Sequence, residues 1–509
     1  MAHEHHETVV VGFGPCGAFA AGLLGQAGFA TLAIDRSRDI YDKPRAIALD
    51  HEILRLFDGL GVAEAVLPHC APFPPSDHFG ADGQLIRRID MVPEPYPLGF
   101  VPTMVFSQPP VEAALRAHAM AMPGVKVELG TECVGISIEN GKAFLRLRDA
   151  NGGERTVTAD TVLACDGASS FLRRSLGLVL EDLDFDEPWL VVDLRVSPTG
   201  LAKLPVHAAQ FCDPTRPVTY IVGPGNHRRF EIMLLPGEDP QAMQEPMSVY
   251  ALLSRWLDPG DAEIWRAASY RFHALVAREW RRGPVFLAGD AAHQQPPFLG
   301  QGMCQGLRDV ANLVWKLAAV RDGAPASLLD TYGEERGRHV RTLTARIKQI
   351  GQQICERDPE AARARDAALL AQGGGKPLVV TRQEILPPLE TGFLDGRGHP
   401  AEGVLFPQPW VWADGAWRRM DRVTGGGWRI FLPSQAPPVA GGWRIGPPGS
   451  TAELVERDGV AADWFARFGV FGAVVRPDHY VFGVADDPSS LAALRARVAA
   501  ALQSSGVLV

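Results

Sequence analysis

The sequence lacks an uninterrupted apolar run of about 18 residues, the length that a membrane-spanning helix requires. Its N-terminus lacks the charged and apolar regions of a signal peptide. It also lacks an excess of basic residues: 50 lysines and arginines stand against 59 acidic residues, for a net charge of −9. A general nucleic-acid surface normally needs a basic stripe. We therefore expect a cytoplasmic protein with neither a membrane nor a nucleic acid as its partner.

Cysteine is sparse and scattered. The seven cysteines form no CxxC pair and no Cys/His cluster at metal-binding spacing. This pattern predicts neither a disulfide framework nor a zinc site, and we expect no metal. His3, His5 and His6 are interpreted as part of a frayed tail rather than as metal ligands.

The composition is that of an ordinary globular protein. Of the 509 residues, 46% are hydrophobic and 21% are charged. A chain of this length and composition can bury a large core, and we expect two to four domains.

The first fifty residues carry a strand, a glycine turn, a helix, a second strand and an acid. Residues 8–11 are a β-branched run that leads into Gly12, Gly14 and Gly17, and residues 31–34 are followed by Asp35. Gly12 allows a tight turn, Gly14 lets backbone amides approach a pyrophosphate, and Gly17 allows close packing of helix on strand. Asp35 is placed to accept the ribose hydroxyls. The unit predicts a dinucleotide site, but NAD and FAD share it.

Two later segments repeat the pattern of a strand that ends in an acid. An apolar run ends at Asp166-Gly167, and Arg173 follows. A second run ends at Gly289-Asp290 and is followed by Pro297, the sequence Gly-Gln-Gly at 300–302 and an amphipathic helix over about 303–320.

In this order, the glycine turn, the DGxxSxxR segment and the GDAAHxxPPxxGQGM segment resemble the FAD-dependent aromatic hydroxylases, the class A flavoprotein monooxygenases. The stretch QFCDPTRPVTYIVGPGNHRRFEIMLLPGE is most similar to the 3-(3-hydroxyphenyl)propionate hydroxylase branch. Near the end, GVLFPQPWV and VVRPDHYVFG resemble the thioredoxin-like C-terminal domain of phenol-hydroxylase relatives.

The resemblance implies tight, non-covalent FAD binding, NADPH or NADH as a transient co-substrate, and O₂. It assigns Asp290 to the ribityl chain, Arg45 to the flavin–pyrophosphate region, and 300–303 to the N1–C2 edge of the flavin. Asp166 and Arg173 are also linked with NAD(P)H handling. The complete set of predicted cofactor-binding residues is Gly12, Gly14, Pro15, Gly17, Asp35, Arg36, Arg45, Gln108, Asp166, Asp290, Pro297, Gly300, Gly302 and Met303.

One position departs from the family pattern. The family usually has asparagine after GQGM, where this chain has Cys304. A small residue under the flavin is the preferred interpretation. A reactive thiol stays an alternative, because a helix N-terminus can lower the pKa of a cysteine.

The middle of the chain changes to short strand candidates separated by Pro/Gly turns, at 189–196, 206–211, 218–222, 229–235 and 268–277. We expect an antiparallel sheet, one face of which covers the flavin and forms the substrate pocket. Alternation over 229–235 leaves open which face meets the pocket. Tyr220, His207 and Gln210 are weak candidates for substrate contact, and ordinary sheet surface is preferred for each.

The predicted fold class is therefore α/β: a Rossmann-type FAD-binding domain, an inserted antiparallel-sheet substrate domain and a small thioredoxin-like C-terminal domain. The predicted boundaries assign 1–75, 101–180 and 281–370 to the FAD-binding domain, 76–100 and 181–280 to the substrate domain, and 385–509 to the C-terminal domain.

The predicted function is hydroxylation of a small phenol, such as a 3-(3-hydroxyphenyl)propionate-like compound, with NAD(P)H and O₂ through a C4a-hydroperoxyflavin. A general base near the phenol would help, but the sequence does not identify it. An epoxidase or dehydrogenase on the same fold, or a non-enzymatic FAD-binding scaffold, remain alternatives. A flavin halogenase is disfavoured because its WxWxIP motif is missing. A homodimer is left open.

Overall fold

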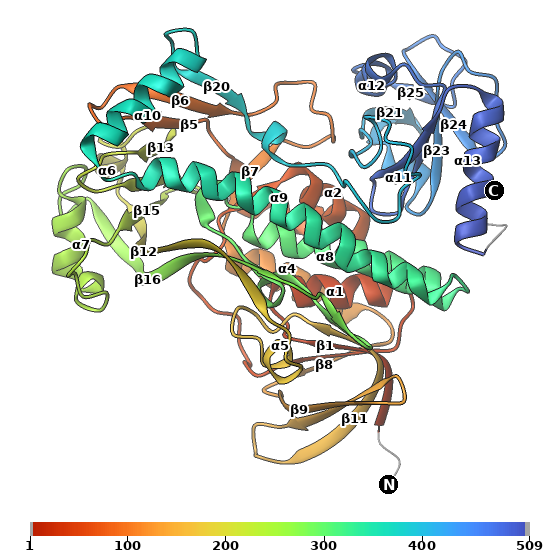
Figure 1. Ribbon diagram of the computed structural model, residues 1–509, viewed down its shortest axis with the longest axis horizontal. Coiled ribbons are helices and arrows are strands. Elements are labelled where there is room, and N and C mark those ends of the chain that lie inside the picture. The colour runs from red at the N-terminus through yellow and green to blue at the C-terminus, as the bar shows by residue number, and fades with distance from the viewer. Residues whose placement is uncertain (1–3, 504–509) are drawn as a thin grey trace.

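The computed structural model describes residues 4–503, whose strands form four sheets (Figure 1). The sheet at the bottom of Figure 1 begins the chain. Its central strands are parallel, and their order places β1 between β11 and β2. Its members, in order, are β17 (Arg281–Arg282), β18 (Val285–Leu287), β11 (Glu154–Ala164), β1 (Glu4–Val11), β2 (Thr31–Asp35) and β8 (Val125–Leu129). Off this order, β10 (Lys142–Arg148) pairs with β11, and β9 (Glu132–Glu139) pairs with β10.

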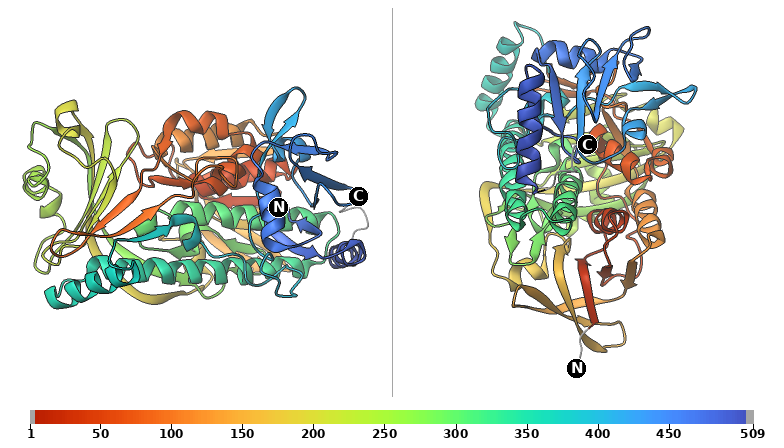
Figure 2. Two further views of the ribbon diagram at one scale, coloured as in Figure 1. Left: turned by 90° about the horizontal axis from the view of Figure 1, so that it is seen from above. Right: turned by 90° about the vertical axis from the view of Figure 1, so that its right-hand side faces the viewer.

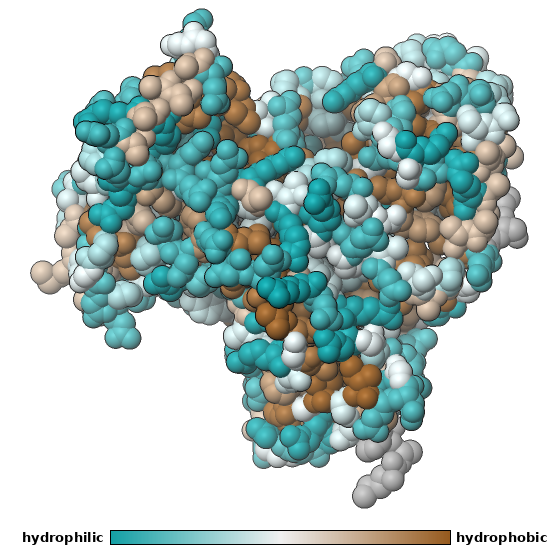
Figure 3. Space-filling view, in the orientation of Figure 1, coloured by the Kyte–Doolittle hydropathy of each residue, from teal (hydrophilic) through white to brown (hydrophobic). Residues whose placement is uncertain are grey.

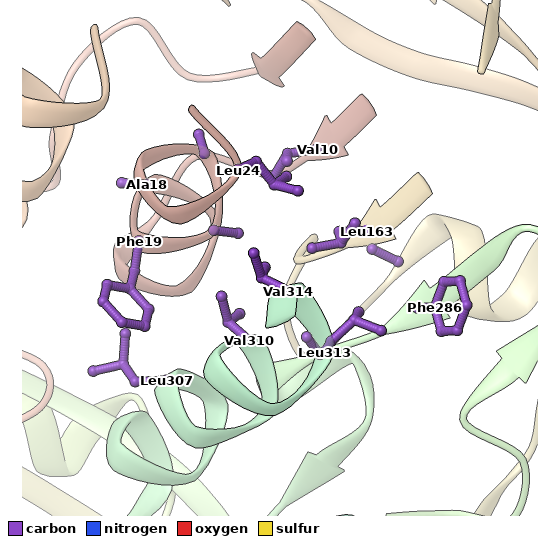
Figure 4. Close-up of a cluster of buried hydrophobic side chains, with 14 of the residues drawn as sticks. Val10, Ala18, Phe19, Leu24, Leu163, Phe286, Leu307, Val310, Leu313 and Val314 are labelled. Carbon is purple, nitrogen blue, oxygen red and sulfur yellow. The ribbon is translucent and has the colours of Figure 1, made fainter. Parts of the chain in front are cut away.

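Helices α1 (Pro15–Gln26) and α8 (Gly302–Arg321) pack their apolar side chains together beside the ends of these strands (Figure 4). Phe19 of α1 meets Leu307 of α8, and Val10 and Leu163 belong to the same buried cluster. The other helices of this region are α2 (His51–Leu60), α3 (Ala63–Val66), α4 (Gln108–Ala121), α5 (Phe171–Ser175) and α9 (Asp330–Cys355).

Strand β1 starts earlier than the sequence predicts. It begins at Glu4, and His5 and His6 pair in register with Thr158 and Ala159 of β11. The expectation of a frayed tail is therefore wrong for these two histidines, because the long β11 offers them backbone partners. His3 lies outside the described residues.

The second sheet is mostly antiparallel and is built largely from the middle of the chain. Two strands from residues 76–90 also belong to it, because the first of them pairs with β13 and the second pairs with the first. The whole sheet has nine strands. In order these strands are β19 (His293–Gln294), β16 (Ala262–Ala277), β12 (Leu180–Val196), β15 (His227–Met233), β14 (Val218–Val222), β13 (Ala208–Phe211), β5 (Ser76–Phe79), β6 (Leu85–Asp90) and β20 (Leu378–Thr381).

Three helices belong to this region, one of which packs its buried Val249 and Leu253 against the apolar face of the sheet, and a separate sheet has three strands. The helices are α6 (Pro198–Leu201), α7 (Pro246–Leu253) and α10 (Pro359–Gln372), and the small sheet contains β3 (Ala48–Asp50), β7 (Thr103–Phe106) and β4 (Cys70–Pro72). The domain boundaries given above stay predictions.

The C-terminal sheet lies at the opposite end of the molecule from the middle strands (Figure 2). Its core has the thioredoxin-like order β24 (Gly442–Gly446), β23 (Arg429–Pro433), β26 (Gly472–Val475) and β27 (Val481–Ala485), in which only the first pair is parallel. The remaining elements are β22 (Ala416–Arg419), β21 (Trp410–Ala413), β25 (Leu454–Glu456), α11 (Asp421–Thr424), α12 (Val460–Phe468) and α13 (Pro488–Ala501).

One face of the molecule mixes hydrophobic and hydrophilic residues (Figure 3). In the view of Figure 3, hydrophobic residues appear as separate areas among hydrophilic ones. None of the helices within residues 4–503 is both long enough and apolar enough to span a membrane.

Candidate active site

The acids that follow the predicted strands lie at the carboxyl ends of the parallel strands of the first sheet. Register pairs Val11 of β1 with Ala164 of β11 and Ile34 of β2, and pairs Ala164 with Leu287 of β18. The carboxyl ends of these parallel strands therefore coincide. In open α/β sheets, ligands bind in the crevice outside these carboxyl ends.

The glycine turn between β1 and α1 has the shape of a phosphate cradle. A Cβ on Gly17 would lie 1.8 Å from the carbonyl oxygen of Gly12, so the packing there permits only glycine. A Cβ on Gly14 would meet nothing within 4 Å, and no side chain caps α1, which starts at Pro15. The free amides of this helix N-terminus can receive a pyrophosphate.

Asp35 braces the same turn. Its carboxylate accepts hydrogen bonds from the backbone amides of Phe13 at 2.7 Å and Ser37 at 2.8 Å. Arg36 beside it is exposed. The proposed contacts of Asp35 and Arg36 with FAD stay predictions.

Asp166 and Arg173 lie in the turn after β11. One oxygen of Asp166 accepts a hydrogen bond from Leu172 N at 3.0 Å, the other has no partner among the described residues, and burial raises the pKa of this carboxyl. The Arg173 guanidinium donates to the carbonyl oxygens of Ala291 (3.0 Å) and Ala168 (2.9 Å). Arg173 thus fastens this turn to the Gly289–Ala291 turn. Its role in NAD(P)H handling stays a prediction.

Asp290 points outward from the turn after β18. Its carboxyl group is exposed and makes no hydrogen bond or ion pair with residues 4–503. The turn itself is held from below by Asp309 of α8, which accepts hydrogen bonds from Gly289 N at 3.0 Å and binds His293 Nε2 at 2.7 Å. His293 is therefore a buried structural residue, and Asp290 is free for a ligand.

The start of α8 faces the second sheet. Gly300 has φ of +59°, and a Cβ there would lie 2.8 Å from the Cβ of Ala48. No side chain caps α8, whose N-terminal amides and dipole favour negative charge. Reduced flavin carries such charge at N1. Together with the open Gly14 cradle and the unpartnered Asp290, this terminus fits FAD.

Two of the predicted cofactor-binding residues, Gln108 and Arg45, also interact with other parts of the protein. The side chain of Gln108 accepts a hydrogen bond from Ala46 N at 2.7 Å and donates to Glu112 at 3.2 Å. Arg45 is half-exposed, with Nη2 3.8 Å from the carboxylate of Glu112. Both hold the segment before β3 against α4, and their contacts with FAD stay predictions.

Cys304 lies in the first turn of α8 and is fully buried. Its thiol donates a 3.5 Å hydrogen bond to the carbonyl of Ala48, and burial raises its pKa well above the ordinary range. The helix dipole does not overcome this desolvation, so the thiol stays protonated. The structure therefore argues against a reactive thiol at this position, and the small-residue interpretation stays a prediction.

A cavity of about 150 Å³ lies between the start of α8 and the face of β13, β14 and β15. Pro297, Gly300, Gly302 and Met303 line it on one side. Arg45, Ile47 and Ala48 close another side, and Phe73, Phe298 and Arg382 complete the wall. The predicted flavin edge and the substrate sheet therefore meet at one cavity.

The structure decides which face of 229–235 meets this cavity. Arg229 and Glu231 line it, whereas Phe230 and Ile232 belong to the apolar cluster on the other side of the sheet. Neither Arg229 nor Glu231 was among the residues that the sequence predicts for the site. The available signal was their period-2 alternation with apolar residues, which marks two faces but not which one encloses a ligand.

Of the three weak substrate candidates, only Gln210 presents its side chain to the cavity face. It accepts a 2.6 Å hydrogen bond from Thr219, its cross-strand neighbour. Tyr220 borders the cavity, but its ring packs on Phe230 and its hydroxyl donates to Pro205 O at 3.2 Å.

His207 binds Asp77 at 2.9 Å and is not among the residues that line the cavity. The preferred interpretation of sheet surface describes it better than substrate contact.

Comparison with known proteins agrees with this geometry. Residues 5–347 match the protein family described as FAD binding domain. The chain is 33% identical over 518 residues to a probable NADH-specific resorcinol 4-hydroxylase of Rhodococcus jostii, covering 97% of this chain and 95% of that protein. It is 34% identical over 519 residues to 3-(3-hydroxy-phenyl)propionate/3-hydroxycinnamic acid hydroxylase 2 of Burkholderia vietnamiensis, covering 94% and 93%.

Solved structures show the same fold. The flavin-dependent monooxygenase PieE, in complex with FAD and substrate, has a TM-score of 0.83 at 22% identity and covers 98% of this chain and 99% of its own. A ternary complex of aklavinone-11 hydroxylase has a TM-score of 0.80 at 22% identity, with 99% and 100% covered.

The chain thus belongs to the FAD-binding family of flavoprotein monooxygenases. Within that family it is an FAD-dependent aromatic hydroxylase that uses NAD(P)H and O₂. The similarities do not favour the alternatives of a dehydrogenase, an epoxidase or a non-enzymatic scaffold.

Proposed function

We propose that this hydroxylase acts on a compact single-ring phenol of the resorcinol type, with NADH as the electron donor. The observation that carries the proposal is the cavity of about 150 Å³ that Arg229 and Glu231 line beside the start of α8. A cavity of this volume accommodates one benzene ring. The relative named as an NADH-specific resorcinol 4-hydroxylase, which matches over almost the whole chain, supports the same substrate class and donor.

A 3-(3-hydroxyphenyl)propionate-like phenol is the second candidate. Its carboxylate would need a cation, and Arg45 and Arg382 both border the cavity. Arg45 has half of its side chain exposed and can follow a longer substrate toward solvent. The relatives named as 3-(3-hydroxy-phenyl)propionate hydroxylases support this candidate.

Different residues of the chain would hold FAD, exclude water and orient the substrate. The Gly12–Gly17 turn, the Asp290 carboxyl and the amides at the start of α8 would hold FAD. When bound, FAD supplies electrons from NAD(P)H and the activation of O₂. The walls of the cavity, Ile47, Phe73 and Phe298 among them, exclude water from the reacting ring. Arg229 and Glu231 orient the polar substituents of that ring.

The first test is aerobic NADH and NADPH oxidation by the purified yellow protein with resorcinol, phenol and 3-(3-hydroxyphenyl)propionate, with the product mass measured. We expect resorcinol to stimulate NADH oxidation and to yield a product one oxygen heavier. Turnover confined to the phenylpropionate would favour the second candidate. Flavin reduction without any oxygenated product would contradict both.

A cytoplasmic location and a homodimer belong to the same proposal. All seven cysteines are free, which is typical of a reducing compartment. Light scattering of the FAD-containing protein would measure the oligomeric state.

A further inference from the structure

Glu231 is a buried carboxyl group in the wall of the substrate cavity. It lies in the middle of β15, between Thr219 of β14 and Val191 of β12. Only 2% of its surface is exposed. Buried acidic side chains in proteins are normally paired or fully hydrogen-bonded, because an isolated buried charge is costly.

Glu231 does not meet that requirement. Its Oε2 has no hydrogen-bond partner within residues 4–503. The adjacent Thr219 hydroxyl is engaged, since it donates to Gln210 at 2.6 Å. The cross-strand position therefore leaves one carboxylate oxygen for a ligand.

The nearest cation, Arg229, is also largely engaged elsewhere. Its Nε donates to Asp193 at 2.7 Å and its Nη1 donates to the carbonyl oxygen of Arg45 at 2.7 Å. Nη1 lies 4.0 Å from Glu231 Oε1, which is beyond a hydrogen bond. The Nη2 of Arg229, like Oε2 of Glu231, has no partner among the described residues.

The cavity thus contains an unpartnered acceptor and an unpartnered cationic donor on neighbouring positions of one strand face. A phenolic hydroxyl supplies the matching groups, because its proton needs an acceptor and its oxygen can accept a hydrogen bond. An apolar ring would leave both protein groups unpaired, which gives the site a means to select phenols.

We propose that Glu231 is the catalytic base for the substrate phenol, with Oε2 receiving the phenolic proton and Arg229 Nη2 donating to the oxygen left behind. The phenolic O–H bond breaks, an O–H bond to Oε2 forms, and the electron pair stays on the phenolate oxygen. The negative charge then faces the guanidinium, and the ring becomes more reactive toward an electrophilic oxygen. This inference rests on the proposed function, since it requires a phenolic substrate.

The electrostatics of the cavity suit this role. Burial raises the pKa of Glu231 to about 7, Arg229 opposes the rise, and Asp193 adds to it. A free phenol has a pKa of about 10. The raised pKa of Glu231 therefore reduces the difference between the pKa values of base and substrate. The other charged groups that face this region are Arg266, which lies 3.4 Å from Asp193, and Arg45 and Arg382 in the cavity wall.

A histidine on the same side of the sheet does not supply the base. His78 lies in β5 opposite Gln210, and burial together with Arg87 lowers its pKa well below the ordinary range. It is neutral at physiological pH, and its Nδ1 is 2.9 Å from Arg87. It is also absent from the residues that line the cavity.

The test compares the FAD-containing wild type with Glu231→Gln, which keeps the shape and loses the base. With resorcinol at pH 7 we expect kcat to fall by about 100-fold or more, as is typical for loss of a general base. The loss should diminish as the pH approaches that at which the phenol ionises in solution, and a more acidic phenol such as 3-nitrophenol should lose less. Glu231→Asp should restore part of kcat.

A second measurement needs no turnover. Oxidised enzyme titrated with 3-nitrophenol at pH 7 should show the absorbance of bound phenolate with the wild type and of bound phenol with Glu231→Gln. The matched control is Glu263→Gln, an exposed carboxylate of β16 in the same sheet, which should behave as the wild type in both measurements.

The outcomes separate the inference from the proposed function. If the wild type hydroxylates resorcinol or the phenylpropionate and Glu231→Gln keeps its kcat and pH profile, the inference is overturned and the proposed function stands. If the wild type oxygenates no phenol, both are overturned. A uniform loss of activity at all pH values and with all phenols, with unchanged phenolate absorbance, would assign Glu231 a structural role and overturn the inference.

Discussion

Two glutamates of this protein are equally buried, yet their environments shift their pKa values in opposite directions. Glu231, in the substrate cavity, is 2% exposed, and Glu335, on the face of α9 that contacts the C-terminal domain, is 1% exposed. Burial raises the pKa of Glu231 to about 7. Burial acts in the same direction on Glu335, but Arg476 and Lys316 more than offset it and hold its pKa far below the usual range.

The partners explain the difference. Glu335 lies 2.8 Å from Lys316 Nζ and 2.7 Å from Arg476 Nη2, and it accepts further hydrogen bonds from Asn312 and Phe393 N. Glu231 has a single cation at 4.0 Å and one oxygen without a partner. The protein therefore satisfies the Glu335 carboxylate completely, whereas it leaves one oxygen of Glu231 without a partner within residues 4–503.

The largest expected effect follows from breaking the paired group. Glu335→Gln leaves Lys316 and Arg476 buried without their counter-charge, so we expect a loss of about 3–5 kcal/mol in the free energy of unfolding at pH 7. Denaturant unfolding of the FAD-containing protein measures it, with the exposed neighbour Glu334→Gln as the control.

The pH dependence of this loss has a definite sign. The folded pKa of Glu335 is depressed, so its contribution is present above the unfolded value of about 4.3 and is lost as the pH falls below it. The difference between variant and wild type should therefore shrink in acid. A variant as stable as wild type at pH 7 would show that this pair does not hold the C-terminal domain.

The opposite effect is expected from Glu231, whose single cation lies 4.0 Å away. The folded pKa of Glu231 is raised, so the charged form destabilises the fold, and this penalty grows as the pH rises from about 4.5 to 7. Glu231→Gln should stabilise the protein at pH 8 by at most about 3 kcal/mol, and by less at pH 5. Melting temperatures at both pH values test this, with Glu263→Gln as the control. Destabilisation at pH 8 would mean that Glu231 is satisfied by the protein.

The smallest effect on stability is expected at a third carboxylate, which is exposed and unpaired. Asp290→Ala should change the stability of the apoprotein by no more than about 0.5 kcal/mol, because the side chain makes no hydrogen bond or ion pair with residues 4–503. It should nevertheless weaken FAD retention, measured as the flavin-to-protein ratio after gel filtration. Full flavin occupancy would remove Asp290 from the cofactor site. Asp463→Ala, at an exposed position of α12, is the control.

Local pattern predicted the cofactor end well. The glycine turn, the acids at strand ends and the helix from about 303 all lie where spacing placed them, because these features depend on residues within one strand–turn–helix unit. The bounds of the long strands were predicted less well. β16 begins at Ala262 rather than 268, since its pairing with β12 overrides its weak local signal.

The sequence by itself determined the FAD-binding unit and the antiparallel sheet in the middle, since both rest on short-range motifs and periodicity. The resemblance of its motifs to those of known hydroxylases indicated the family. Only the tertiary structure decided that Arg229 and Glu231 face the substrate cavity and that Glu335 is paired. Both decisions depend on which residues from distant segments surround a carboxyl group: Asp193 and the 297–303 segment for one, Lys316 and Arg476 for the other. Burial and partners set the charge of a side chain, and neither is visible in a strand's alternation.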